Sequence, residues 1–346
     1  MKNEQKVLYR KYRPSNFKEV LGQEHIIKAL NGAINLGNIS HAYLFAGTRG
    51  TGKTSIARIL ASEIGCTAND LYEIDAASNR GIDDIRELRD SVNVLPFDSP
   101  YKVYIIDEVH MLTKEAFNAL LKTLEEPPKH VIFVLATTEM EKLPDTIVSR
   151  CQSFNFKKPS QQILRELVLN VAEKEGFKLE PASADLIAVL GDGSFRDTHG
   201  ILQKVINSSE DKKITTKEVE EITGAPKGDL VNDFISSIAE SEIEKGLTAI
   251  SVAVENNVDM KIFTKLILHK MRAILLLRYA KDLEKTFKSE FSEKDFEFLN
   301  KLSKDKEANI TSNTIKEMLD CYGQIGRAYI LQLPLEMALV KLASAK

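Results

Sequence analysis

The sequence contains few cysteines, and their positions exclude a fold stabilised by disulfides or by a cysteine-bound metal ion. Three cysteines occur in 346 residues, at Cys66, Cys151 and Cys321. They lie far apart and lack the close spacing that is typical of a disulfide framework or of a set of metal ligands. At this length the chain is expected to form two or three domains, each of which buries its own apolar core.

The sequence also lacks an excess of positive charge and a long apolar run. The formal net charge is −3, so any contact with nucleic acid must come from a local basic patch. The most apolar stretch, residues 262–280, is interrupted by Lys265, Lys270 and Arg272, which excludes a membrane-spanning helix. Residues 1–6 have no apolar core and are not a signal peptide. We therefore expect a cytoplasmic protein that does not contact a membrane.

What the sequence does contain is a phosphate-binding motif between a strand pattern and a helix pattern. Residues 47–54, GTRGTGKT, match G-x-x-x-x-G-K-[ST] at every fixed position. The apolar segment 41–46 predicts a buried parallel strand, and residues 55–61 have apolar side chains at helical spacing. Lys53 is expected to reach the β- and γ-phosphates, and the Thr54 hydroxyl to ligate Mg²⁺. The residues expected to bind ATP here are Gly47, Thr48, Arg49, Gly50, Thr51, Gly52, Lys53, Thr54 and Ser55.

A second acidic motif follows downstream and completes the pattern of an ATPase site. The apolar segment 101–108 predicts a strand that ends in Asp107 and Glu108. Asp107 is expected to hold Mg²⁺, directly or through water, and Glu108 to orient and polarise the attacking water. Thr138 follows another predicted strand, and ligands bind at the carboxyl ends of parallel strands.

The remaining segments of the first 158 residues predict a five-stranded parallel sheet with flanking helices. The predicted helices cover residues 23–36, 82–89 and 115–126, and the further strands cover 71–75, 131–136 and 152–156. Residues 9–14, YRKYRP, mix basic and aromatic side chains. This segment can be a nucleic-acid patch, a solvated arm or part of a nucleotide pocket, and its composition alone does not choose among these.

Taken in order, these motifs resemble those of the bacterial clamp-loader ATPases, the gamma/tau subunits of DNA polymerase III, which are AAA+ ATPases. The resemblance extends from about Tyr9 to residues 333–339. The motifs that carry it are YRP at 12–14, the loop at 47–54, IDAAS at 74–78, IDEVHML at 106–112, LEEPP at 124–128, LATT at 135–138, SRC at 149–151 and GSFRD at 193–197.

The resemblance implies roles for single residues. Thr138 is implied as a first sensor of the γ-phosphate, and Arg196 as a second sensor that reaches from a lid onto the nucleotide. Arg150 is implied as an arginine finger that completes the site of a neighbouring subunit, so that Glu108, Lys53 and Arg150 are the catalytic candidates. Residues 9–14 would then border the adenine.

One departure from the family concerns zinc. The family usually inserts a zinc module with four cysteines between the first helix after the loop and the second strand. Here Cys66 stands alone in that region. Because structural zinc needs four nitrogen or sulfur ligands, we predict no zinc site.

The predicted domains are an AAA+ P-loop core at 1–158, a small all-α lid at 159–224 and an all-α collar at 225–346. The linker signal GAPKG at 224–228 separates the last two. In the family the collar joins the subunits into a ring. We therefore expect it to be an oligomerisation domain.

The function that the resemblance implies is that of an ATPase: an ATP-hydrolysing motor subunit in a hetero-oligomeric ring, which opens a sliding clamp and loads it on primed DNA. Two alternatives are a structural subunit of the same ring and an AAA+ remodeller of branched DNA.

Two sets of contacts remain open in the sequence. Arg80, Arg86 and Lys142 are either phosphate contacts to primer-template DNA or ordinary surface charges. Leu95 and Phe97 lie in a proline-rich turn, where they either fold back into the core or, as the resemblance implies, form an apolar plug for the clamp.

Overall fold

The computed structural model describes residues 7–209, 211–280, 282, 284, 287–288 and 291–344. Residues 1–6, which were predicted not to be a signal peptide, lie outside the described residues. The chain forms two compact units, of which the first is Met1–Leu164 with Gly191–Gly200 and the second is Arg165–Leu190 with Ile201–Lys346. The predicted division into three domains at 158 and 224 stays a prediction.

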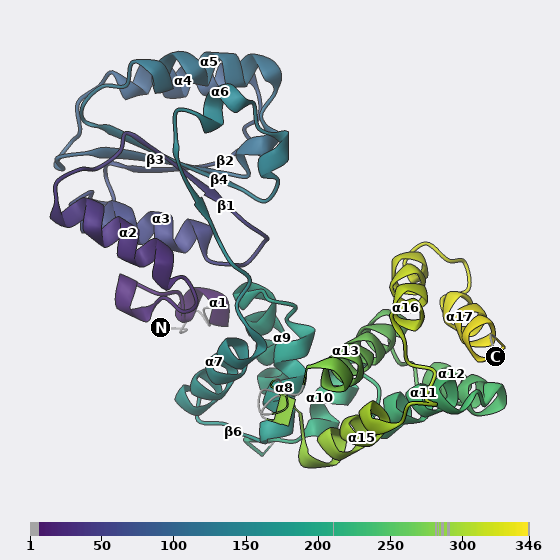
Figure 1. The fold of residues 1–346 in the computed structure, drawn as a ribbon. Helices are drawn as coiled ribbons and strands as arrows, with labels where there is room; N and C mark the ends of the chain where they lie inside the picture. The colour runs from purple at the N-terminus through teal and green to yellow at the C-terminus, as the bar shows by residue number, and fades with distance from the viewer. Residues whose placement is uncertain are drawn as a thin grey trace. The chain divides into compact units, whose positions relative to one another are not determined.

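The first unit is an α/β fold (Figure 1). Its strands are β1 (Ala42–Ala46), β2 (Leu71–Asp75), β3 (Lys102–Asp107), β4 (Val131–Thr137) and β5 (Gln152–Asn155). Its α-helices are α1 (Leu8–Lys11), α2 (Glu24–Asn35), α3 (Lys53–Glu63), α4 (Ile82–Val92), α5 (Lys114–Glu125) and α6 (Asp145–Val148), to which the start of α9 (Phe195–Ser208) is added. Three short 3-10 turns are η1 (Phe17–Glu19), η2 (Val109–Met111) and η3 (Met140–Lys142).

All five strands are parallel and follow the order β2-β3-β4-β1-β5. Residues of β1 therefore pair with β4 on one side and β5 on the other, with Ala46 opposite Thr137 and Asn155. This arrangement confirms the predicted five-stranded parallel sheet. It also places the carboxyl ends of β1, β3 and β4 at one edge of the sheet.

The three inner strands β3, β4 and β1 are buried because they are apolar at successive positions, whereas the outer strands β2 and β5 are largely exposed. Helices α4, α5 and α6 cover one face, and α2 and α3 cover the other (Figure 1). Alternate residues of β1 supply the two cores: Leu44 packs with the first group of helices, and Tyr43 and Phe45 pack with the second.

Local signals explain where several helices begin and end. The hydroxyl of Thr113 accepts a hydrogen bond from the backbone N–H of Ala116 and caps α5. Helix α5 ends at Glu125, shortly before Pro127 and Pro128, which have no N–H to continue it. The sequence analysis did not predict α1, which turns part of the 9–14 segment into helix.

The second unit is mainly helical. Its helices are α7 (Gln161–Lys174, of which the first four residues belong to the first unit), α8 (Pro181–Leu190), the rest of α9, α10 (Thr216–Thr223), α11 (Gly228–Glu240), α12 (Ile243–Glu255), α13 (Met260–Tyr279), α15 (Glu293–Lys304), α16 (Ser312–Ile325) and α17 (Leu333–Ala343). Helices α11, α12, α13, α15, α16 and α17 surround one large apolar cluster. The two-residue strands β6 (Lys178–Leu179) and β7 (Lys213–Ile214) pair in parallel within the region predicted as an all-α lid, and the sequence analysis missed them.

Helix α13 contains the most apolar stretch of the sequence, and its buried lysine forms hydrogen bonds within the unit. The buried Lys270 donates to Asp295 Oδ1 at 2.6 Å and to Asn232 Oδ1 at 2.9 Å. Among the described residues, none of the helices has the length and apolar character needed to cross a membrane.

Candidate nucleotide-binding site

The loop between β1 and α3 has the backbone of a phosphate cradle. Gly50 and Gly52 have φ of 76° and 101°, which only glycine adopts without strain. A Cβ placed on Gly50 would lie 2.0 Å from Ser194 Oγ, whereas one placed on Gly52 would meet no atom within 4 Å. Open space therefore lies in front of Gly52, at the first turn of α3, where backbone N–H groups and the helix dipole favour an anion.

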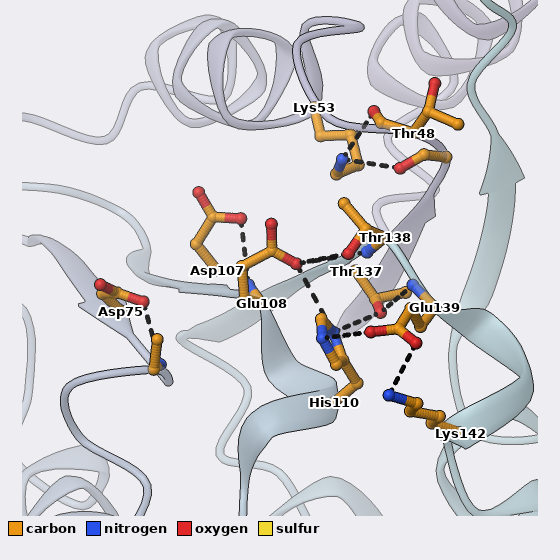
Figure 2. Close-up of polar contacts among 12 residues, drawn as sticks. Thr48, Lys53, Asp75, Asp107, Glu108, His110, Thr137, Thr138, Glu139 and Lys142 are labelled. Atoms are coloured by element: carbon orange, nitrogen blue, oxygen red, sulfur yellow. Dashed lines mark hydrogen bonds and ion pairs between the residues drawn. The ribbon is translucent and has the colours of Figure 1, made fainter. Parts of the chain in front are cut away.

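Lys53 is buried and folds back over this loop. Its ammonium donates to the carbonyl oxygens of Gly47 at 2.8 Å and Thr48 at 3.1 Å (Figure 2). Burial lowers the pKa of Lys53, and the nearby carboxylates of Glu108 and Asp107 act in the opposite direction. The side chain is thus a cation held at the mouth of the loop, with acidic groups close by.

The second motif meets the loop at the end of β3. The hydroxyl of Thr54 donates to Asp107 Oδ2 at 2.8 Å, and Asp107 Oδ1 accepts from the backbone N–H of Glu108 at 3.0 Å. One hydroxyl and one carboxylate thus face each other beside the open loop. Hydroxyl and carboxylate oxygens are ligands suited to Mg²⁺, so the residues present fit a magnesium-bound triphosphate.

Glu108 adopts a strained backbone conformation that turns its side chain towards β4. Its φ of 49° lies in the left-handed region, which costs a residue with a Cβ about 1 kcal/mol or more. Its Oε2 accepts hydrogen bonds from the N–H of Thr138 at 3.3 Å and from the hydroxyl of Thr138 at 3.0 Å (Figure 2). The structure thus places the carboxylate predicted to act on water against the predicted first sensor.

The sequence analysis missed His110, which links this pair to the surface. Only 5% of its side chain is exposed, and its Nδ1 lies 3.0 Å from the Thr137 hydroxyl and 3.5 Å from Glu108 Oε2. Its Nε2 lies 3.2 Å from Glu139 Oε1 and acts as the donor, because a carboxylate only accepts. Figure 2 shows this chain of contacts. A histidine three residues after Asp107 was the available signal.

The chain of contacts ends at Lys142, one of the candidate DNA contacts. Lys142 Nζ lies 2.7 Å from Glu139 Oε2, and this hydrogen bond is the main reason why the pKa of Glu139 is lowered. Arg86 also pairs with an acid, Asp83, at 3.0 Å on the exposed face of α4. Arg80 is exposed. A role for these three side chains in DNA binding stays a prediction.

Arg196 and Arg150, the two arginines with predicted roles, have different surroundings. The backbone N–H of Phe195 donates to the carbonyl of Gly50 at 2.9 Å, which brings the start of α9 to the loop. Arg196 is exposed, and its guanidinium carbon lies 5.1 Å from the centre of the Tyr9 ring. Arg150 instead donates to Glu125 Oε1 at 2.7 Å and to the Thr146 carbonyl at 2.8 Å.

The predicted site residues are therefore only partly gathered by this structure. Two further members of the loop are Arg49, which is exposed, and Ser55, which is partly buried in α3. The contacts described above join the loop to both acidic residues and to β4. The residues they bring together are Gly47, Thr48, Lys53, Thr54, Asp107, Glu108 and Thr138.

Leu95 and Phe97 do not fold back into the core, since both are exposed, and their role as a plug for the clamp stays a prediction. The exposed fractions are 72% for Leu95 and 83% for Phe97, and neither belongs to an apolar core. The turn is held from beneath by Asp70, whose carboxylate accepts from the N–H groups of Phe97 at 2.6 Å and of Asp98 and Ser99 at 3.0 Å. An ordered turn thus presents two apolar side chains to solvent.

Zinc was predicted to be absent. Among the described residues, no three or more His, Cys, Asp and Glu side chains are grouped so that they could hold a metal ion. The three cysteines are free thiols. The absence of zinc stays a prediction.

Comparison with known proteins identifies relatives of the chain. The family model described as "DNA polymerase III, delta subunit" matches residues 22–80 and 69–160. The chain is 40% identical over 298 residues to the DNA polymerase III subunit tau of Bacillus subtilis. This match covers 80% of this chain and 53% of that protein. It is 40% identical over 274 residues to the tau subunit of Escherichia coli, covering 73% of this chain and 42% of that one.

The fold has solved neighbours as well. A Holliday junction branch migration motor, RuvB of Thermotoga maritima, superposes with a TM-score of 0.53 at 23% identity, covering 66% of this chain and 80% of the motor. This likeness confirms the predicted AAA+ P-loop fold and shows the fold alone. The chain spans about half the length of the curated relatives it matches.

Asp70 provides a test of how the exposed turn is held. Burial alone would raise its pKa, but hydrogen bonds from Phe97, Asp98 and Ser99 outweigh burial and lower it to about 2. Since the folded pKa lies below the unfolded value, the stabilisation is present above pH 4 and is lost as the pH falls towards 2. We expect Asp70→Asn to lower the free energy of unfolding by about 2 kcal/mol at pH 7.

Urea unfolding of both proteins at pH 7 and pH 3 measures this. The difference between wild type and Asp70→Asn is expected to be smaller at pH 3. An equal difference at both pH values would show that the charge of Asp70 does not hold the turn.

Proposed function

Since the chain belongs, over the 298 matching residues, to the family of DNA polymerase III gamma/tau subunits, we propose that it is an ATP-hydrolysing subunit of a clamp loader. In this proposal it uses ATP to open a sliding clamp and place it on primed DNA. The observation that carries the proposal is the meeting of Lys53, Thr54, Asp107 and Glu108 at the open glycine loop.

The residues of the loop bind and orient the nucleotide. The ammonium of Lys53 exchanges its two carbonyl partners for phosphate oxygens, and the oxygens of Thr54 and Asp107 hold Mg²⁺. Bound Mg²⁺ supplies positive charge to the phosphoryl oxygens during transfer. Glu108 orients the attacking water and accepts its proton.

The contact between Thr138 and Glu108 gives the site two arrangements. The Thr138 hydroxyl has one proton and donates it here to Glu108 Oε2. When the same hydroxyl donates to a γ-phosphate, this hydrogen bond to Glu108 is lost, and the carboxylate is left to orient water. The predicted sensor therefore acts on the predicted base through a shared hydrogen bond.

The alternatives have less support. A structural subunit has no need of an intact lysine, magnesium-binding pair and catalytic glutamate, and all are present in this sequence. A remodeller of branched DNA draws on the likeness to the branch migration motor, which is 23% identical. The tau subunits are more similar, at 40% identity.

Assembly into a ring is supported by exposed apolar side chains near the end of the chain. A group of exposed apolar side chains is typical of a surface that binds another protein. Large apolar side chains are exposed in the connection between α16 and α17 and on these two helices. These residues are Leu319, Tyr329, Ile330, Leu331, Leu333, Met337 and Val340. We propose that this surface contacts other subunits of the loader.

The first test separates nucleotide binding from hydrolysis. Lys53→Ala removes a phosphate contact and is expected to abolish ATP binding, whereas Glu108→Gln is expected to bind ATP and to hydrolyse it at least about 100-fold more slowly. Equilibrium binding of a fluorescent ATP analogue and the steady-state ATPase rate measure the two effects. Circular dichroism checks that each variant folds. If both variants lost ATP affinity equally, the separate roles would be wrong.

Arg150 is proposed to act on the ATP of a neighbouring subunit. Its side chain is 34% exposed, and its partner Glu125 is exposed as well. A surface ion pair of this kind contributes about 1 kcal/mol or less, so the guanidinium can leave Glu125 at little cost. The arginine is therefore available to a phosphate that a second subunit presents.

The second test uses the assembled loader. Arg150→Ala is expected to keep ATP binding in the isolated subunit and to lose hydrolysis in the ring by a factor of about 10³. Arg89→Ala, which removes another half-exposed arginine beside an acid, is the matched control and should keep full activity. Hydrolysis by Arg150→Ala at the rate of the control would exclude the finger.

The exposed turn is proposed to contact the clamp. Leu95 and Phe97 are the most exposed apolar side chains on the segment between α4 and β3. A short apolar anchor with polar neighbours is typical of a binding hot spot, worth about 2 kcal/mol if it becomes buried.

The third test replaces both residues with alanine. Because they are exposed, the double variant should keep its melting temperature and basal ATPase rate, while its affinity for the clamp in ATP falls about 30-fold. Leu36→Ala removes an equally exposed leucine after α2 and should change none of the three. Unchanged clamp affinity in the double variant would remove this turn from the interface.

A further inference from the structure

His199 of α9 is buried in the first unit, and one of its ring nitrogens has no hydrogen-bond partner. The side chain is 5% exposed, and Nδ1 lies 2.6 Å from the carbonyl oxygen of Phe195, one helical turn earlier. Nε2 is also buried and contacts no donor or acceptor. A buried polar atom without a partner is unfavourable, so it is a place where a ligand atom can be expected.

The chemistry of the unpartnered nitrogen follows from its neighbour. A carbonyl oxygen only accepts, so Nδ1 of His199 carries the proton and donates it to Phe195. Burial lowers the pKa of His199, which keeps the ring neutral at pH 7. In the neutral ring the other nitrogen is an acceptor. Nε2 therefore needs a hydrogen-bond donor.

The surroundings of His199 suit a flat aromatic ligand next to phosphates. The ring of Tyr12 is nearly parallel to that of His199, with an interplanar angle of 11° and 6.5 Å between centroids. The helix that carries His199 starts at the phosphate loop, since the N–H of Phe195 donates to the Gly50 carbonyl. Arg196, on the same turn, lies over the ring of Tyr9. Tyr9 and Tyr12 thus lie against α9, the helix whose start contacts the phosphate loop.

We propose that Nε2 of His199 accepts a hydrogen bond from the 6-amino group of a bound adenine, and that His199 makes the site select adenine over guanine nucleotides. Adenine carries a donor at position 6, whereas guanine carries a carbonyl acceptor there. If the guanine carbonyl faced Nε2, two acceptors would meet, and neither atom would have a hydrogen-bond donor. The inference rests on the proposed function, because it requires that the loop binds a nucleoside triphosphate.

Binding measurements with three nucleotides test the role of His199. The full chain is titrated with ATP, with GTP and with purine riboside triphosphate, which lacks the 6-amino group, and dissociation constants are determined by calorimetry. Wild type is expected to bind ATP about tenfold more tightly than purine riboside triphosphate, and GTP more weakly still. In His199→Leu, ATP and purine riboside triphosphate should bind equally.

Two controls separate the hydrogen bond from a change in packing. Leucine fills a similar volume and removes an unpaired nitrogen, so His199→Leu should not lower the melting temperature of the free protein. His130→Leu removes another histidine of the same unit, whose Nε2 bonds the Val92 carbonyl, and should keep the wild-type preference. If His199→Leu does not fold, His199→Gln, whose amide oxygen can accept, is expected to retain part of the preference.

The outcomes distinguish this inference from the proposed function. Tripolyphosphate, which has no base, probes the loop alone and should bind wild type and His199→Leu equally. Failure of wild type to bind ATP and tripolyphosphate would contradict the proposed function itself. Binding of ATP with the same preference over purine riboside triphosphate in wild type, His199→Leu and His199→Gln would overturn the role of His199.

Discussion

The parallel register of β1 beside β4 is the constraint on which the rest of the site depends. Ala46 lies opposite Thr137, and the N–H of Gly47 continues the ladder by donating to the Thr137 carbonyl at 3.1 Å. This register ends the first strand beside the fourth, and β3 pairs with the other side of β4. Because parallel strands end at one edge, the loop, the acidic pair and Thr138 meet there.

The polar groups at that edge are stabilised by one another, which explains how a strained glutamate persists. Glu108 holds a left-handed backbone that its residue type disfavours, and Thr138 fixes its carboxylate with two hydrogen bonds. The ring of His110 lies between Glu108 and Glu139, with one ring nitrogen near each carboxylate. The hydrogen bonds from Thr138 hold the carboxylate of Glu108 in one orientation, against the end of β4.

Glycine at position 50 matters for a reason beyond the motif. A side chain there would collide with Ser194, which directly precedes α9. The missing Cβ lets the start of α9 approach the loop closely enough for the bond between Phe195 and Gly50. The phosphate loop and the start of α9, which carries Arg196 and His199, therefore belong to one compact unit, although the sequence separates them.

The sequence by itself determined the sheet, the phosphate loop and the acidic motif. Their signals are local: apolar strands, glycines before Lys53, and Asp107 and Glu108 at the end of a strand. Tertiary structure alone decided which distant groups pair. It exposed Leu95 and Phe97 on a turn that the carboxylate of Asp70 holds, paired Arg150 with Glu125, and buried the side chains of His110 and His199. These outcomes depend on contacts between residues far apart in sequence, because burial and hydrogen bonding are settled by the packed neighbours and leave no periodic pattern in the chain.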